Sequence, residues 1–472
     1  MIPGRSCRRI GSLNIAVAVL LATVTARADE AVSTNASQAD AFLATDARAW
    51  AAVPEILARI KPPVFPDRRF LITGYGATGD GAADCTEAFR KAIDACSASG
   101  GGKVIVPPGI FLTGAIHLKS NVDLDLARGA TIRFSTDRKK FLPPVFARYE
   151  GTEVMNYSPF IYALGQENIA ITGQGTIDGQ GAAWHDWKSF SDPRQLVALG
   201  DRGVPVAERK FGSGHHLRPN FIVPVRCKNV LIAGVRIVNS PMWVLQPLYC
   251  TNVTIRDVMV DTTGPNTDGC DPDSSTGVLI QDCNFSDGDD CIAIKSGRDV
   301  DGRRVNIPSR NIVIENCEFK DGHGGVTVGS ETSGGVENVF AEHCRFDSPN
   351  LDMAVRLKTG MTRGGFIQSI HVRDCAVKIA RVGIAMTMRY PGTLDGRAPP
   401  VIRDIAIRNC AFARLTRQPM VIEGYSEAVR ITDVAIADCV FENTAKASVV
   451  TNASRVFLIR DRGSRLGESS RR

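Results

Sequence analysis

The chain has 472 residues, of which 22% are charged and 44% hydrophobic, and this balance is typical of a soluble globular protein. The formal net charge is +6, but the first 28 residues carry four arginines and no acid. The rest of the chain has 52 basic and 50 acidic residues. That balance argues against a nucleic-acid-binding protein, which carries a concentrated basic footprint.

The first 28 residues have the three parts of a secretory signal peptide. Arg8 and Arg9 end a basic start, Ile15–Val24 is a short apolar run, and Ala26-Arg27-Ala28 fits the small-residue rule for cleavage. The apolar run is too short to span a bilayer, which needs about 20 residues, and no other stretch is long and apolar enough. We therefore expect an exported protein, secreted or periplasmic, that is not held in a membrane.

Two further N-terminal stretches predict local structure. Residues 29–62 read as a linker with a short Ala-rich helix. In residues 85–98, Phe89, Ile93 and Cys96 recur at helical spacing, and three glycines at 100–102 end the pattern. Because the open end of stacked strands exposes unpaired backbone groups, we expect this second helix to cap the N-terminal end of a strand stack.

A short phrase, Asn/Asp-Val-x-Ile-x-Asp/Asn-Cys-x-Phe, recurs along the second half of the chain. Most copies alternate apolar and polar residues, which is the period of a β-strand. From Asn229 onward the copies are 23 to 35 residues apart. The clear copies begin at Asn229, Asn252, Gly277, Asn311, Asn338, Ser369, Asp404 and Asp433, and looser ones at Asn121 and Asn168.

Short strands at this spacing, with Gly, Asp and Asn between them and no helices of comparable length, predict an all-β solenoid of stacked coils. Strands of successive coils would pair in parallel, about 4.8 Å apart. We expect one such domain over 63–461, followed by a disordered polar tail over 462–472. The gaps of different length then become loops, which can build a cleft. We expect the protein to be a monomer.

The cysteines fall mostly into fixed slots of the repeat. Valine takes the main slot in two copies, so this slot is expected to be an interior position where cysteine acts as a small hydrophobe. Cys227 and Cys250 share a second slot, whereas Cys85, Cys96, Cys270 and Cys291 lie outside both and are the better disulfide candidates. The main slot holds Cys283, Cys317, Cys344, Cys375, Cys410 and Cys439.

Polar residues crowd into the coils between 266 and 358. Asp289 and His323 each lie four residues after the phenylalanine of their repeat, which places them on neighbouring coils. Arg356 and Lys358 are two residues apart and share one face of a strand. The segment 266–273 fits the preceding coil and brings Asp268 beside Asp290. Strict alternation would turn Asp290 inward, so a turn near Gly288 must break the pleat.

One solvent-facing patch is therefore predicted to hold three carboxylates, a histidine and two cations: Asp268, Asp289, Asp290, His323, Arg356 and Lys358. Glycoside hydrolysis needs one protonated acid and one ionised carboxylate, and neighbouring acids push their pKa values apart. The two cations would hold an anionic sugar, since arginine can bind a carboxylate through two hydrogen bonds. An acidic polysaccharide is the implied substrate. Trp184, Trp187 and Trp243 are more typical of packing than of sugar stacking.

At these residues the chain resembles the polygalacturonase family of glycoside hydrolases, which degrade pectin in plant cell walls. Four phrases carry the resemblance, in order along the chain: Asn266-Thr267-Asp268, Gly288-Asp289-Asp290, Gly322-His323-Gly324 and Arg356-Leu357-Lys358. Looser similarity runs from about Phe70 to about residue 445. The resemblance implies a single right-handed parallel β-helix, inversion at the anomeric carbon, a galacturonan substrate, and no metal or cofactor.

The resemblance also implies residue roles. Asp289 would be the general acid, Asp268 and Asp290 would activate the attacking water, and His323 would support the protonation of the acid. The substrate-binding residues implied are Arg356, Lys358, Asn266 and Tyr390. The family's usual Arg-Ile-Lys is Arg-Leu-Lys here. An insertion over Gly181–Pro219, together with the N-terminal extension, would close one end of the cleft and favours exo action.

Two other functions use the same residues. A calcium-dependent lyase would bind Ca²⁺ between the aspartates, because carboxylate oxygens suit that ion, and it would give an unsaturated product. A non-catalytic polysaccharide-binding solenoid would bind glycans without turnover. A chelator experiment separates the lyase from the hydrolase.

Overall fold

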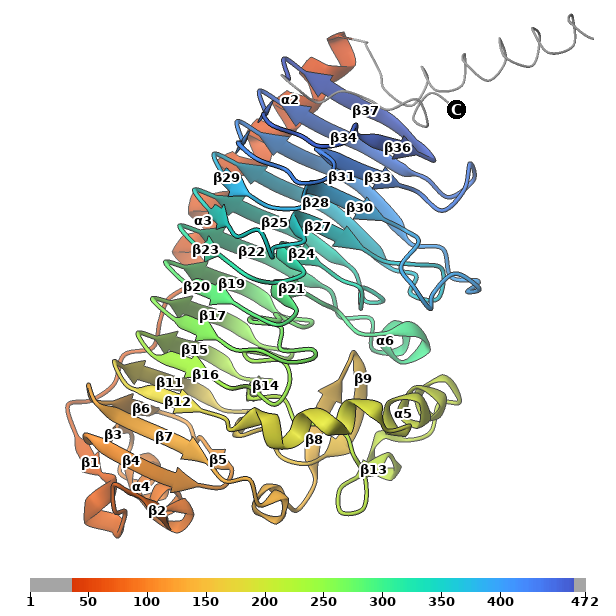
Figure 1. Cartoon of the computed structure of the whole chain (residues 1–472). Coiled ribbons are helices and arrows are strands. Elements are labelled where there is room, and N and C mark those ends of the chain that lie inside the picture. Colours follow the sequence, from red (N-terminus) through yellow and green to blue (C-terminus); the bar gives the residue numbers. More distant parts are fainter. Residues whose placement is uncertain (1–35, 462–472) are drawn as a thin grey trace, which may run out of the picture.

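The computed structural model describes residues 36–461, which form a stack of parallel β-coils (Figure 1). The predicted signal peptide and C-terminal tail lie outside these residues. Two long sheets run the length of the stack, one of 13 strands (sheet A) and one of 12 (sheet B). A six-stranded sheet (sheet C) forms a third face over the C-terminal coils. No helix among residues 36–461 is long and apolar enough to cross a membrane.

The strands follow one another in the order of the chain within each sheet. Sheet A contains β1 (Arg69–Leu71), β3 (Gly102–Val106), β6 (Val122–Leu126), β11 (Glu167–Gly173), β15 (Lys228–Ala233), β17 (Thr251–Arg256), β19 (Thr276–Gln281), β22 (Ser309–Glu315), β25 (Val336–Glu342), β28 (Phe366–Arg373), β31 (Val401–Arg408), β34 (Ile431–Ala437) and β37 (Ala453–Ile459). Sheet B contains β2 (Asp80–Asp84), β4 (Gly109–Thr113), β7 (Ala130–Phe134), β12 (Thr176–Asp178), β16 (Arg236–Val238), β18 (Met259–Asp261), β20 (Asn284–Ser286), β23 (Glu318–Phe319), β26 (Arg345–Asp347), β29 (Ala376–Ile379), β32 (Ala411–Phe412) and β35 (Val440–Phe441).

Sheet C contains β21 (Asp290–Ile294), β24 (Gly324–Val328), β27 (Met353–Lys358), β30 (Val382–Thr387), β33 (Met420–Glu423) and β36 (Val449–Thr451). Isolated bridges through Leu245 and Cys270 continue this face toward the N-terminal coils. There it meets the three-stranded sheet of β5 (Ile116–His117), β10 (Ile161–Leu164) and β14 (Ile222–Val225). The repeat therefore predicted the architecture correctly.

The Asn and Asp residues that begin the repeats occupy the corners between coils. Asn229 and Asn252 have φ values of 58° and 60°, in the left-handed region that Asn and Asp tolerate better than other non-glycine residues. Their side chains also bond along the stack: Asn252 Nδ2 donates to Asn229 Oδ1 at 2.6 Å, and Asn229 Nδ2 to Asn168 Oδ1 at 2.8 Å. The repeat thus encodes the corner geometry as well as the strand.

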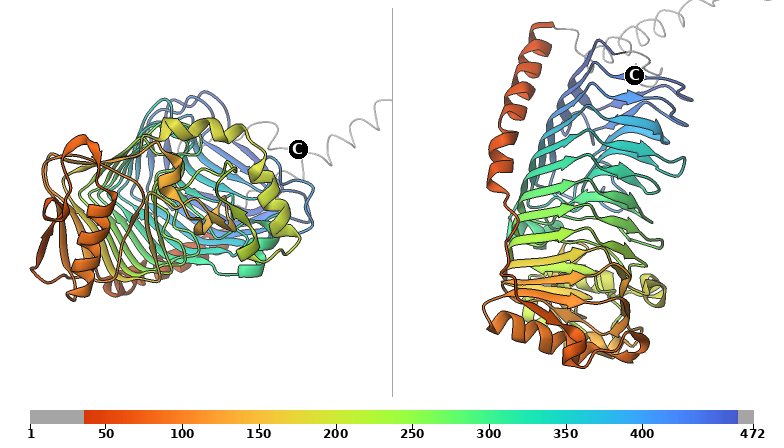
Figure 2. Two further views of the ribbon diagram at one scale, coloured as in Figure 1. Left: turned by 90° about the horizontal axis from the view of Figure 1, so that it is seen from below. Right: turned by 90° about the vertical axis from the view of Figure 1, so that its left-hand side faces the viewer.

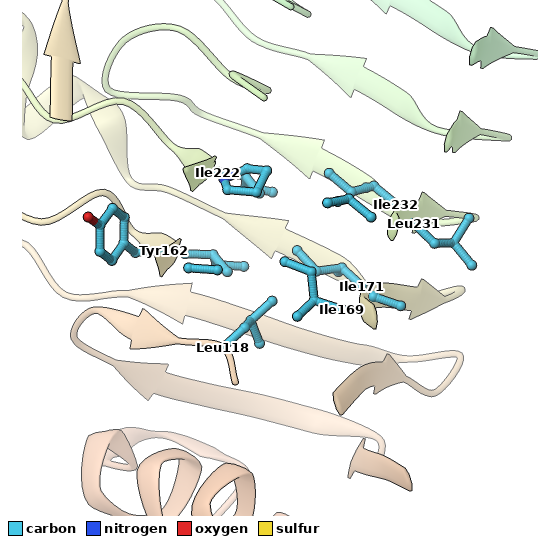
Figure 3. A pocket seen from close by; sticks show the side chains of 12 residues that line it. Leu118, Tyr162, Ile169, Ile171, Ile222, Leu231 and Ile232 are labelled. Carbon is cyan, nitrogen blue, oxygen red and sulfur yellow. The ribbon is translucent and has the colours of Figure 1, made fainter. Parts of the chain in front are cut away.

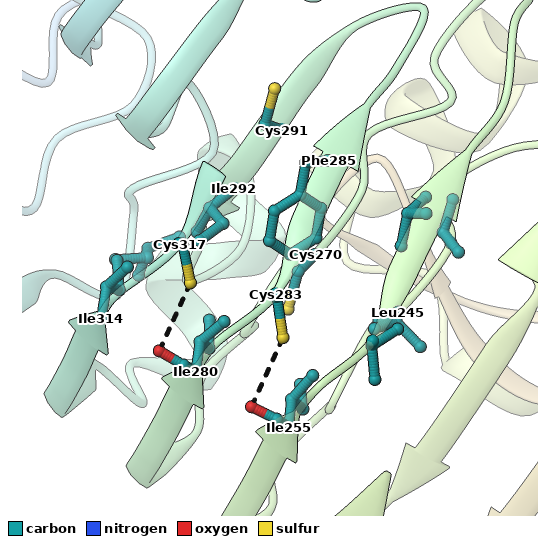
Figure 4. Packing of buried hydrophobic residues seen from close by; sticks show 14 of the residues in the cluster. Leu245, Ile255, Cys270, Ile280, Cys283, Phe285, Cys291, Ile292, Ile314 and Cys317 are labelled. Carbon is teal, nitrogen blue, oxygen red and sulfur yellow. Dashed lines mark hydrogen bonds between the residues drawn. The ribbon is translucent and has the colours of Figure 1, made fainter. Parts of the chain in front are cut away.

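The cysteine ladder lies inside the coils, as predicted. Cys283 Sγ donates to the carbonyl oxygen of Ile255, and Cys317 Sγ to that of Ile280, each at 3.7 Å (Figure 4). The four cysteines outside the slots, which were the better disulfide candidates, are not paired: all twelve cysteines from Cys85 to Cys439 are free and buried. Those four occupy small inward positions of the same core, namely Cys85, Cys96, Cys270 and Cys291.

Helix α4 (Thr86–Ala98) covers the N-terminal end of the stack, as its pattern predicted, and buries Phe89, Ile93 and Cys96. The stretch expected to be a linker with one short helix instead forms α2 (Ala36–Ala51) and α3 (Val53–Arg59), which run along the outside of sheet A (Figure 2). Trp50 packs there on Phe340, with ring centroids 5.2 Å apart. These helices therefore bind the later coils together.

A group of smaller elements lies beside the face of sheet C, near its N-terminal end (Figure 1). It contains the antiparallel pair β8 (Val145–Tyr149) and β9 (Thr152–Asn156), with β13 (Lys210–Phe211) alongside β9. The helical members are η3 (Gly181–Ser189), α5 (Asp192–Asp201), η4 (Val206–Glu208) and α6 (Asp299–Val305). The remaining short helices are η1 (Ile72–Tyr75) and η2 (Arg138–Phe141).

Candidate active site

Parallel pairing in sheet C brings the predicted residues together. Thr327 in β24 pairs with Arg356 in β27, and Asp290 in β21 pairs with Gly324. The pairing skips Cys291 between Asp290 and Ile292, and both Cys291 and Ile292 belong to the core. The pleat is therefore broken at this point, as the sequence required, and Asp290 faces outward toward Arg356.

The three aspartates form one compact cluster. One carboxylate oxygen from each of Asp268, Asp289 and Asp290 lies within 4.8 Å of the others. Arg356 Nη1 donates to Asp290 Oδ1 at 2.9 Å, and Lys358 Nζ donates to Asp290 Oδ2 at 2.5 Å. The two predicted cations are thus bound to one acid of the cluster.

His323 contacts a different acid. Its Nδ1 lies 3.0 Å from Asp289 Oδ1. Half of the His323 side chain is exposed (51%), compared with 17% of the Asp289 side chain. The pair therefore forms the open edge of the cluster, while Asp290 forms its base.

The expectation of a solvent-facing patch is wrong in one respect. The side chains stand on the outer face of sheet C, but Asp268, Asp290 and Lys358 are 2%, 0% and 4% exposed. Elements beside sheet C that do not carry the repeat line the same cavity as Asp268 and Lys358, through Glu150, Lys188 and Arg298. Charges in this enclosed place interact more strongly than they would on an open surface.

Burial and neighbouring charges drive the pKa values of the aspartates apart. Burial raises the pKa of Asp268 to about 7, and the charges of Asp289 and Asp290 add to this effect while Lys295 opposes it. Burial also acts to raise the pKa of Asp289, but the hydrogen bond with His323 and the charge of Lys358 outweigh it, so the pKa of Asp289 is lowered. The same hydrogen bond raises the pKa of His323. In the free protein the proton of the Asp289–His323 pair therefore rests on the histidine.

Sequence reasoning missed Lys295, which is fully buried in the middle of the site. Its Nζ lies 3.2 Å from Asp268, 3.3 Å from Asp271 and 3.4 Å from Glu331. It also lies 4.3 Å above the ring centroid of Trp243. Alternation along Ile292-Ala293-Ile294-Lys295 turns Lys295 outward, so the strand pattern was the signal that could have found it.

The cluster opens into a cavity of about 220 Å³ on the face of sheet C. Asn266 and Tyr390, the other two predicted binding residues, line it. Of the tryptophans, only Trp243 reaches it, whereas Trp184 and Trp187 pack in the core. The full lining is Glu150, Lys188, Trp243, Asn266, Asp268, Asp289, Lys295, Arg298, Ser330, Glu331, Lys358, Arg363, Tyr390, Pro391 and Gly392.

A second gap lies inside the coils between β10, β11 and β15 (Figure 3). Its volume is about 10 Å³ and its walls are apolar, with Leu118, Ile169 and Ile232 among them. A space of this size holds at most one water molecule. It belongs to the packing of the core.

The donor set of the cluster suits a cation poorly. Three carboxylates within 4.8 Å could in principle hold a hard metal ion. However, Arg356 and Lys358 already occupy both oxygens of Asp290, and His323 and Lys295 bond to the other two acids. A calcium ion would therefore meet four cationic groups at this place.

Comparison with known proteins gives three related findings. The family model "Glycosyl hydrolases family 28" matches residues 205–456. A probable polygalacturonase from Vitis vinifera is 31% identical over 402 residues, which cover 80% of this chain and 75% of that protein. A solved structure, a hyperthermoactive exopolygalacturonase from Thermotoga maritima, is 39% identical with a TM-score of 0.84, over 88% of this chain and 97% of that one.

Proposed function

We propose, from the premise that the chain belongs to family 28 of the glycosyl hydrolases, that it removes galacturonate units from one end of α-1,4-linked galacturonan. The chain is a glycoside hydrolase with polygalacturonase relatives. The exopolygalacturonase from Thermotoga maritima supports the end-directed action. The single observation that carries the proposal is the carboxylate cluster on the wall of a small cavity that also holds cationic side chains.

Asp289 supplies the proton to the leaving sugar. In the free protein the proton rests on His323, and the Nδ1–Oδ1 contact of 3.0 Å lets it pass to Asp289 when the glycosidic oxygen approaches. The proton then moves from Asp289 to that oxygen as the bond to the anomeric carbon breaks. His323 restores the proton from solvent, which its exposed edge allows.

Asp268 is the stronger candidate for the base that activates water. Its Oδ1 is buried and has no hydrogen-bond partner among residues 36–461, so it can accept a proton from a water molecule. Its pKa of about 7 also makes it a better proton acceptor than an ordinary aspartate. Asp290, with both oxygens bonded to cations, orients Arg356 and Lys358 toward the sugar carboxylate.

The cavity is small for a chain to pass through. Its volume of about 220 Å³ lies below the roughly 300–1,000 Å³ of common ligand pockets. Glu150 from the β8–β9 turn, Lys188 from η3 and Arg298 before α6 line it. The Gly151 position in that turn is close-packed, since a Cβ there would lie 2.7 Å from Arg298 Cβ. We therefore assign the closed end to the terminal sugar of the substrate.

Sizing the products of polygalacturonate over time tests this function. An end-directed hydrolase releases one small product from the first minutes, while the viscosity of the polymer falls slowly. A ladder of intermediate sizes would contradict end-directed action. Activity that stops with a chelator and gives an unsaturated product would show that the protein is a lyase. Binding of the polymer without any product would show that it is a non-catalytic carbohydrate-binding solenoid.

Residues 1–28 have the pattern of a signal peptide for export, and they lie outside the residues that the structure describes. We propose that the signal peptide is removed after Ala28 and that the protein is secreted or enters the periplasm. N-terminal sequencing of the exported protein should begin at Asp29. Retention of the first 28 residues in the mature protein would contradict this.

A further inference from the structure

The cavity is lined by five cationic side chains, and four of them have acidic partners. Lys295 pairs with Asp268, Asp271 and Glu331, Lys358 with Asp290, Arg298 with Glu150 and Asp299, and Arg363 with Asp299 and Glu331. Their charges are therefore largely balanced by the protein itself. A cation that is already paired with a carboxylate of the protein contributes least to the binding free energy of an anionic sugar.

Lys188 is the exception. Within residues 36–461 its ammonium group contacts no carboxylate, and its hydrogen bond goes to the side-chain oxygen of Asn266. Arg218 Nη2 donates to the same oxygen at 2.8 Å. The amide oxygen thus holds Lys188 at the cavity wall without neutralising its charge.

The helix that carries Lys188 is firmly fixed. Trp184 and Trp187 of η3 pack in the core, and His185 Nε2 bonds to the carbonyl oxygen of Ser240 at 2.9 Å. The start of η3 approaches that backbone so closely that a Cβ at Gly181 would lie 2.1 Å from the Ser240 oxygen. A fixed helix keeps the ammonium group in place before the substrate arrives, which lowers the cost of binding.

We propose that Lys188 binds the carboxylate of the terminal galacturonate, the sugar that occupies the closed cavity and is released. This inference rests on the proposed function. Arg356 does not line the cavity, whereas Lys358 lines it together with Tyr390. Arg356, which lies outside the cavity, would then serve the carboxylate on the other side of the bond that is cleaved. Lys188 is thereby a specificity-determining residue for an acidic sugar at the chain end.

The test compares two trimers: trigalacturonate, and the same trimer with the carboxylate of the released terminal sugar reduced to an alcohol. For Lys188→Gln we expect KM for trigalacturonate to rise about 10- to 100-fold, the range of one hydrogen bond to a charged group. On the reduced trimer, Lys188→Gln and the unaltered enzyme should have the same kcat/KM. Lys188→Arg, which keeps the charge, should recover most of the loss.

The control is Lys210→Gln, an exposed lysine of the same inserted segment, which should leave both trimers unaffected. Equal losses on both trimers, no loss on trigalacturonate, or an Arg variant as poor as the Gln variant would each overturn the inference. Unchanged thermal midpoints of the variants show that η3 is intact. A lowered midpoint together with equal losses on both trimers also counts against the inference. If the unaltered enzyme cleaves neither trimer, the proposed function fails instead.

Discussion

His323 and Asp289 come from neighbouring coils, 34 positions apart in the chain, and their side chains meet at 3.0 Å. The contact lowers the pKa of the aspartate and raises that of the histidine. In the proposed mechanism one proton is shared by the two groups, and it rests on His323 until an oxygen of the substrate competes for it. The family resemblance assigns the acid role to Asp289, and this pair reconciles that role with a carboxylate that is ionised in the free protein.

Replacing the acid should stop the reaction while leaving the fold intact. For Asp289→Asn we expect kcat to fall about 10²–10⁴-fold, the usual contribution of a positioned general acid. The protein should still fold, with some loss of thermal stability, because His323 and Lys358 stabilise the charge of Asp289 in the folded state and thereby lower its pKa. The measurement is the release of reducing ends from polygalacturonate. Asp347→Asn, at an exposed aspartate on sheet B that pairs with Lys378, is the matched control. Near-normal kcat in Asp289→Asn would remove Asp289 from the mechanism.

Lys295 should set the acid limb of the pH profile. The base Asp268 must be ionised, so kcat/KM should rise as the pH approaches the Asp268 pKa of about 7 from below. Lys295 lowers that pKa, and its loss in Lys295→Met should therefore move the acid limb to higher pH. Activity should suffer more at low pH than at high pH, and Lys295→Arg should restore the profile in part.

A uniform loss at every pH would show that Lys295 acts only through packing. To separate the two cases, the folded fraction of each variant is measured by thermal unfolding at both ends of the pH range. A limb that moves to lower pH would contradict the sign of the interaction.

The sequence predicted the stack of coils and most of the cluster because both follow from strict strand alternation. Laying the Asp289 and His323 phrases on one another gave their true spatial relation, and the break in the pleat at Asp290 was required by the pattern. The outward direction of Lys295 follows from the same alternation. Its ion pairs could not be predicted, because its partner Glu331 lies on a loop after β24.

What lies outside the repeat could not be predicted in the same way. The β8–β9 turn and η3, which carry no repeat phrase, line the same cavity as Asp268 and Lys358, and the burial of these two residues was missed. The disulfide expectation failed for a related reason. Cys270 pairs with Ile292 along the inner face, where a thiol fills space as a small apolar group.

The stereochemistry of the product is open to direct measurement. The carboxylate oxygens of the cluster lie within 4.8 Å, closer than the about 6.5–9.5 Å that separates the two acids in many inverting enzymes. Inversion is implied by the family resemblance and needs only that water reach Asp268 on the far side of the sugar from Asp289. We expect the β-anomer of galacturonate as the first product, observed by proton NMR before mutarotation. An α-anomer would require a covalent intermediate on one of the aspartates.

All twelve cysteines of the exported chain should be reactive thiols once the protein is denatured. Each is free and buried, and burial raises the pKa of the Cys96 thiol to about 11, which slows its oxidation in the folded state. A thiol reagent should therefore find almost none in the native protein and twelve in denaturant. Oxidising conditions should leave the thermal midpoint unchanged, since the stack is held by strand pairing and core packing.

A lower thiol count in denaturant, restored by a reducing agent, would show that cysteines pair after export and that the coils near α4 or β21 adapt to a disulfide. Cys96→Ala and Cys270→Ala, measured separately, would then identify which of the two regions holds it.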